Sequence, residues 1–172
     1  LLRMCLDGAL APRAVVGLNA ALLPFGGLPG RLFGPAARLL ALNPLVPHLF
    51  ARRARQPSVL ERLVANTGSR LDGRGKELYG RLAADPRHVA AALGMMAAWD
   101  LEPLVRDLRH LAPPLVLVVG SQDRTVPPSN AARIQAILPT CQIIRLEGLG
   151  HLAHEEAPAR VAAIIGENFV SG

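Results

Sequence analysis

Two residues that can transfer protons follow two predicted strands of this 172-residue chain. Asp123 lies four residues after the apolar run 115–119, and His151 lies five residues after the run 141–146. Parallel strands end at one edge of a sheet, where catalytic groups gather, so both side chains are expected at the same edge. A carboxylate that faces an imidazole fixes its tautomer and stabilises the imidazolium, which makes the histidine a general base for a nucleophile.

Each of these two residues also has a simpler explanation. An aspartate after a strand often forms a turn or caps a helix, and an isolated Gly-X-Gly-His sequence often has no catalytic role. The 28 residues that separate Asp123 from His151, however, match one strand-to-strand crossover. We therefore expect the two residues to form a catalytic pair.

The elements that position this pair make up the C-terminal region of the chain, residues 101–172. This region holds two predicted strands, each followed by a predicted helix: 115–119, 129–138, 141–146 and 158–169. Strand, helix, strand, helix at this spacing is typical of a parallel α/β unit. A further apolar run at 14–18, within the N-terminal region (residues 1–23), predicts a strand buried on both faces.

The middle region of the chain, residues 24–100, shows helical patterns interrupted by proline and glycine and no strand candidate. Ser58 with Glu61 predicts a capping box that opens a helix, and Asp85 followed by proline predicts the start of another helix that reaches Trp99. Apolar residues at helical spacing over 31–41 add a third. This region is therefore expected to be a helical insertion.

Composition limits the classes of partner. The chain is 51% hydrophobic and 19% charged, which is typical of a compact globular protein and excludes a disordered one. The net charge of +6 would suit nucleic acid, but aromatic residues make up only 3% of the chain and the basic residues are dispersed. No nucleic-acid partner is expected.

The two cysteines, Cys5 and Cys141, lie far apart, with no CxxC motif and no histidine at ligand spacing. No metal site, no cofactor and a location in the reducing cytoplasm are therefore expected. The longest charge-free stretch, 14–30, is interrupted by asparagine, proline and glycine, so it does not have the pattern of a membrane span.

The loops around the two candidate residues resemble those of a known superfamily. Residues 119–127 (VGSQDRTVP) and 148–156 (GLGHLAHEE) are similar to the acid and histidine loops of α/β hydrolases, and they occur in that family's chain order. The resemblance implies the α/β-hydrolase fold: a parallel sheet core, here divided into 1–23 and 101–172, with the helical cap 24–100 inserted between them.

The family's nucleophilic serine, in a G-x-S-x-G turn upstream of the acid, has no counterpart in this chain. None of its serines occupies that motif: Ser58, Ser69, Ser121, Ser129 and Ser171. We expect the N-terminal portion of the fold to be missing, with residues 1–7 belonging to the helix that follows the nucleophile. The alternative is a protein that lacks the nucleophile altogether.

Two runs that lie mostly within the predicted cap carry a closer similarity. Residues 19–53 and 91–103 resemble the magnesium-chelatase accessory proteins of bacteriochlorophyll biosynthesis. This implies a photosynthetic bacterium, a small apolar substrate such as a porphyrin intermediate, magnesium chelatase as a partner, and a cytoplasmic protein at the periphery of the photosynthetic membrane.

Five residues are candidates for binding the substrate: Asn19, Met95, Met96, Trp99 and Val126. Asn19 follows a predicted strand and Val126 lies in the acid loop, although Asn19 is equally explained as a turn residue. The methionine pair and Trp99 fit the wall of an apolar site, although core packing is the more common explanation for such residues at helical spacing.

The function expected from the residues and the resemblance together is acyl-ester hydrolysis, with Asp123 orienting His151 and His151 serving a serine upstream of this chain. The 172 residues by themselves are expected to be inactive. The alternative is a non-catalytic protein that binds a porphyrin or assists the chelatase and has inherited the pair.

Overall fold

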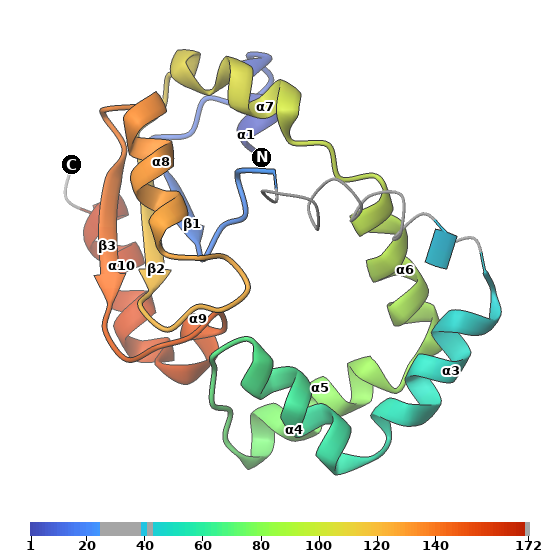
Figure 1. Ribbon diagram of the computed structural model, residues 1–172. Helices are drawn as coiled ribbons and strands as arrows, with labels where there is room; N and C mark the ends of the chain where they lie inside the picture. The colour runs from blue at the N-terminus through green and yellow to red at the C-terminus, as the bar shows by residue number, and fades with distance from the viewer. Residues whose placement is uncertain (25–38, 41–42, 171–172) are drawn as a thin grey trace. The chain divides into compact units, whose positions relative to one another are not determined.

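The computed structural model describes residues 1–24, 39–40 and 43–170 (Figure 1). By contacts between residues the chain divides into two compact units. Leu1–Leu23, Asn66–Arg70 and Leu101–Gly172 form the first, which we call the α/β unit. Pro24–Ala65 and Leu71–Asp100 form the second, the helical unit. Five residues from within the predicted cap, Asn66–Arg70, thus group with the α/β unit.

A three-stranded parallel sheet forms the centre of the α/β unit. Its strands are β1 (Val15–Leu18), β2 (Leu115–Gly120) and β3 (Gln142–Leu146), in the order β1-β2-β3. Leu18 lies opposite Val118, and Gly120 lies opposite Leu146, so the three strands end close together. The predicted parallel sheet is confirmed, and β2 is buried along its whole length, as its unbroken apolar sequence requires.

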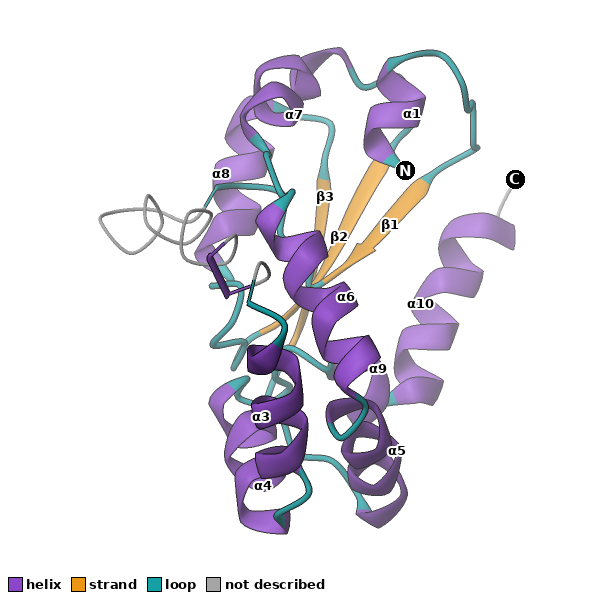
Figure 2. Cartoon of the chain, turned by 90° about the vertical axis from the view of Figure 1, so that its right-hand side faces the viewer, coloured by secondary structure: helices purple, strands orange, loops and turns teal. Residues whose placement is uncertain are grey.

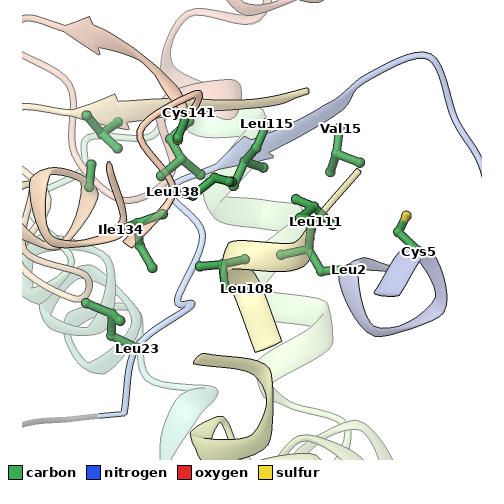
Figure 3. Close-up of a cluster of buried hydrophobic side chains, with 13 residues drawn as sticks. Leu2, Cys5, Val15, Leu23, Leu108, Leu111, Leu115, Ile134, Leu138 and Cys141 are labelled. Carbon is green, nitrogen blue, oxygen red and sulfur yellow. The ribbon is translucent and has the colours of Figure 1, made fainter. Parts of the chain in front are cut away.

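One face of the sheet packs against helical segments from before and after β2. These are α1 (Leu2–Leu6), α7 (Glu102–Asp107), the 3-10 helix Leu108–His110 and α8 (Ser129–Ile137). Leu115 and Leu117 of β2 share a cluster with Leu108 and Ile134, and Leu108 is fully buried (Figure 3). Each such side chain contributes about 1.5–3 kcal/mol to the stability of the folded state.

The opposite face of the sheet packs against α9 (Ala153–Glu156) and α10 (Pro158–Val170). Val116 and Val118 point to this side because successive residues of a strand face opposite ways, and they contact Leu146 and Val161. Figure 2 shows α8 and α10 flanking the sheet. Helices on both faces of a parallel sheet are the arrangement expected of an α/β fold.

The helical unit contains α3 (Leu45–Ala54), α4 (Pro57–Asn66, whose last residue belongs to the α/β unit), α5 (Gly73–Ala83) and α6 (Pro86–Ala97). As predicted, α6 begins after Asp85, whose carboxylate accepts the N–H of Arg87 at 2.8 Å. It ends at Ala97, two residues before the predicted end. In the same way, Asp72 caps α5 by accepting the N–H of Gly75 at 2.6 Å.

The predicted capping box at Ser58 is wrong. Helix α4 begins at Pro57, so Ser58 already lies in its first turn. The physical reason is that the fixed φ of proline suits the first helical position, which makes Pro57 a competing start signal one residue earlier. The predicted helix over 31–41 falls, apart from Leu39 and Leu40, outside the described residues.

Across the regions of the chain that the structure describes, none of the helices combines the length and the apolar character needed to cross a bilayer.

Candidate active site

Asp123 is held at the end of β2 by backbone donors. Its side chain is only 1% exposed, and its Oδ1 accepts the N–H groups of Thr125 and Val126, each at 2.8 Å. This local turn forms because an aspartate can accept from residues two and three positions ahead of it. Two of the hydrogen bonds that hold the carboxylate therefore come from its own loop and do not depend on the loops of the other strands.

Asn19 follows β1 and holds the other oxygen of the same carboxylate. Its Nδ2 donates to Asp123 Oδ2 at 2.7 Å and to the carbonyl of Gly150 at 3.1 Å. The residue is 4% exposed and has a φ of 45°, a left-handed conformation that asparagine tolerates better than most residues. Asn19 thus ties together the loops that follow all three strands.

His151 meets the carboxylate from the loop after β3. Its Nδ1 lies 2.9 Å from Asp123 Oδ2, and its side chain is 27% exposed. An ionised carboxylate only accepts, so Nδ1–H is the donor, and Nε2 is left as the basic nitrogen of the neutral ring. The structure therefore brings Asp123 and His151 together, with the imidazole on the more accessible side of the pair.

The pKa of Asp123 reflects two opposing effects. Burial alone would raise it, but the hydrogen bonds from His151, from Asn19 and from the backbone N–H groups of Val126 and Thr125 outweigh burial and hold the pKa below its ordinary value. Asp123 is therefore ionised at neutral pH, as a residue that orients an imidazole must be.

Two glycines let the loops of the site approach backbone to backbone. A Cβ on Gly120 would lie 2.3 Å from the carbonyl oxygen of Gly150, and a Cβ on Gly150 would lie 2.4 Å from the carbonyl carbon of Gly68. Both distances are too short for any side chain. Gly120 and Gly150, one from each of the two quoted loop motifs, are therefore required by close packing around the pair.

Sequence reasoning missed a fourth segment of the site, Asn66–Arg70, which joins α4 to α5. The carbonyl of Thr67 accepts the N–H of Arg124 and the N–H of His151, each at 3.2 Å. The only signal in the sequence was the run Asn-Thr-Gly-Ser, which is typical of any turn between helices.

The residues predicted to bind substrate fall into both units. Asn19 and Val126 lie in the α/β unit, where they line a small apolar pocket with Leu117, Val119 and Ile134, among other residues. Each of them also donates a hydrogen bond to Asp123, Asn19 from its side chain and Val126 from its backbone N–H.

The other three substrate candidates lie in the helical unit. Met95 and Met96 are on α6, and Trp99 follows that helix. Met95 is 60% exposed and Trp99 is 41% exposed, so neither is packed into the core of its own unit. The role of all five residues stays a prediction.

The serines near the pair are engaged with the backbone. Ser121 Oγ accepts the N–H of Gly148 at 2.9 Å, and Ser69 Oγ accepts the N–H of Leu152 at 2.8 Å. Within the described ranges, no three His, Cys, Asp or Glu side chains come together in a way that could hold a metal ion.

Comparison with known proteins places these features in a family. The sequence profile described as "Alpha/beta hydrolase family" matches residues 4–164. The chain is 39% identical over 164 residues to the magnesium-chelatase 30 kDa subunit of Rhodobacter capsulatus, and the match covers 95% of this chain and 57% of that protein. It is 29% identical over 140 residues to the epoxide hydrolase EphH of Mycobacterium tuberculosis, covering 77% of this chain and 64% of that one.

Solved structures agree on the fold. An alpha/beta hydrolase fold protein from Burkholderia ambifaria superposes with a TM-score of 0.67 at 19% identity, over 96% of this chain and 60% of that one. The 2-hydroxy-6-oxo-6-phenylhexa-2,4-dienoate hydrolase of Rhodococcus sp. strain RHA1 superposes with a TM-score of 0.68 at 18% identity. This match covers 99% of this chain and 59% of that one. The chain therefore spans about three fifths of the length of these relatives.

Proposed function

Because the chain belongs to the alpha/beta hydrolase family, we propose that Asp123 and His151 are the acid and base of a hydrolase that acts by acyl transfer, ester hydrolysis most simply. The nucleophile is a serine that lies outside the 172 residues of this chain. By themselves these residues are expected to be inactive.

One observation carries the proposal: His151 Nδ1 lies 2.9 Å from a buried carboxylate that three other donors already hold in place. Such a fixed position suits a general base, because its lone pair must point at one substrate position throughout the reaction.

The proposed chemistry follows from the tautomer that Asp123 fixes. Nε2 of His151 takes the proton of the serine hydroxyl as its oxygen bonds to the ester carbonyl carbon. The same proton then passes from Nε2 to the leaving alcohol as the carbon–oxygen bond of the ester breaks. Water repeats both steps on the acyl-enzyme, and Asp123 stabilises the transient imidazolium without taking the proton itself.

We assign the physiological role to bacteriochlorophyll biosynthesis, near magnesium insertion. The support is the 39% identity to a protein named as a magnesium-chelatase subunit, which covers 95% of this chain. An apolar porphyrin intermediate is then the proposed substrate, and magnesium chelatase the proposed partner. The proposed location is the cytoplasm, at the surface of the photosynthetic membrane.

The catalytic proposal is tested by first reading the coding region upstream of Leu1 and then expressing the complete reading frame. Turnover of p-nitrophenyl esters is compared for the unaltered protein, His151→Ala and His110→Ala, the last replacing an exposed histidine of the same unit. We expect His151→Ala to abolish turnover and His110→Ala to retain it. Equal turnover in all three would overturn the assignment.

A second candidate function is non-catalytic assistance to the chelatase, with an inherited Asp–His pair. It is favoured by the name of the relative, a magnesium-chelatase subunit. The two candidates differ in one result. If His151→Ala loses ester turnover but still supports magnesium insertion into protoporphyrin by the chelatase, the accessory role does not depend on the pair.

A further inference from the structure

The segment Asn66–Arg70 belongs by contacts to the α/β unit, although the chain on either side of it belongs to the helical unit. It passes directly beside the loop that carries His151. Its packing there involves consecutive residues of both segments.

Three consecutive backbone N–H groups around His151 are engaged with this segment or with a residue bonded to it. The N–H of His151 donates to the Thr67 carbonyl at 3.2 Å. The N–H of Leu152 donates to Ser69 Oγ at 2.8 Å. Ser69 itself is only 4% exposed, so this bond is shielded from water, where it matters more.

The third N–H group is held through Glu156. One carboxylate oxygen of Glu156 accepts the N–H of Gly150 at 2.8 Å, and the other accepts the N–H of Arg70 at 3.0 Å. A single side chain therefore links the residue before His151 to the end of the segment. Charge-assisted bonds of this kind are stronger than neutral ones.

Gly68 makes this close approach possible. Its φ is +80°, and a Cβ at this position would lie 1.9 Å from the carbonyl oxygen of Gln122, in the loop that carries Asp123. On its other side, Gly150 contacts the Gly68 backbone so closely that it too has no room for a side chain. The segment thus lies against the loops of both members of the pair.

We propose that Asn66–Arg70, together with Glu156, is a clamp that sets the position of His151, and that Ser69 and Glu156 are positioning residues for the reaction. This inference rests on the function proposed above. The clamp and the pair that it positions all belong to the α/β unit.

Two variants test the clamp at different N–H groups. Glu156→Gln keeps the shape of the side chain but turns one of its two acceptors into a donor. Its control is Glu155→Gln, which makes the same charge change on the same short helix, where Glu155 lies 3.7 Å from His154. Ser69→Ala removes the acceptor of the Leu152 N–H, and its control is Ser58→Ala at an exposed position of α4.

Two measurements are made on the complete protein. The first is kcat and KM for a p-nitrophenyl ester. The second is the low-field proton resonance of His151 Nδ1–H, assigned by its loss in Asp123→Asn. A displaced imidazole lowers kcat about 10- to 100-fold with little change in KM, since misplacement by about 1 Å is enough for such losses.

We expect Glu156→Gln and Ser69→Ala to lower kcat in this way and to weaken or shift the low-field resonance, with both controls unchanged. Near-ultraviolet circular dichroism identifies a variant that fails to fold. If one of the two variants fails, the kcat and the resonance of the other variant test the clamp. Unchanged kcat and resonance in a folded variant would overturn the clamp. If instead His151→Ala retains turnover, the proposed function fails, and the resonance alone still decides whether the clamp exists.

Discussion

Asn19 and Asp123 are 104 residues apart in the chain and share a buried hydrogen bond of 2.7 Å between Nδ2 and Oδ2. The same amide also donates to the carbonyl of Gly150, the residue before His151. One side chain at the end of β1 therefore fixes both the carboxylate that follows β2 and the loop that follows β3. The Asp–His pair depends on all three strands of the sheet.

Replacing Asn19 is expected to destabilise the protein in two separable ways. Both Asn19→Gly and Asn19→Ala lose a hydrogen bond to a charged group, which contributes about 1.5–3 kcal/mol. Alanine also carries a Cβ into the left-handed conformation at φ 45°, at a further cost of about 1–2 kcal/mol. The free energy of unfolding in urea should therefore be highest for the unaltered protein, lower for Asn19→Gly and lowest for Asn19→Ala. Equal stability of the two variants would contradict the backbone component of this explanation.

The lowered pKa of Asp123 predicts a pH dependence of stability with a definite sign. The unfolded state binds this proton more readily, so the contribution of Asp123 is fully present above its ordinary pKa of 3.8 and is lost as the pH falls from there through the lower folded-state value. In Asp123→Asn that dependence is absent. The difference in unfolding free energy between the two proteins, measured in urea from pH 6 to pH 3, should therefore shrink at the acid end.

Asn19→Gly provides the control for this pH dependence. Losing the amide removes one of the groups that lower the pKa of Asp123, so the pH interval over which stability is lost becomes narrower than in the unaltered protein. An unaltered interval would mean that the amide does not stabilise the ionised carboxylate.

Two glycines of the α/β unit should respond in opposite directions to alanine. Gly150→Ala places a Cβ 2.4 Å from the backbone of Gly68, and overpacking of this kind destabilises by about 1–3 kcal/mol or more. Gly166 lies inside α10 with no atom within 4 Å of the added Cβ, so Gly166→Ala should stabilise the helix by about 0.5–1 kcal/mol. Thermal unfolding measures both, and a stabilising Gly150→Ala would show that the loops can separate without loss.

Much of this arrangement was predictable from the sequence because it depends on apolar patterning. The run 115–119 has to be buried on both faces, which places it in the middle of a parallel sheet, and that placement puts Asp123 and His151 at one edge. The contact of Asn19 with Asp123 was not predictable. A single polar residue after a strand is compatible with a turn, a substrate contact or a bond to a neighbouring loop.

The clamp segment was missed for a different physical reason. Its bonds to His151 and Arg124 are made by a main-chain carbonyl, and the carbonyl of Thr67 is the same as that of any other residue. The residue types that matter in this segment are Gly68 and Ser69, and a glycine and a serine between two helices are typical of any connection. Contacts between backbones far apart in the sequence leave little trace in a single chain.

If Asp123 acts only through His151, the losses of kcat caused by substituting the two residues should not be additive. In the complete protein, His151→Ala removes the base, and Asp123→Asn leaves an imidazole free to adopt the wrong tautomer, for which a loss of about 10⁴-fold in kcat is the known scale in triads of this kind. The double variant should then be no slower than His151→Ala alone, because a missing base has nothing left to orient. Ester turnover of the two single variants and the double variant is the measurement. Additive losses would mean that Asp123 serves the reaction by a route other than the 2.9 Å bond to Nδ1.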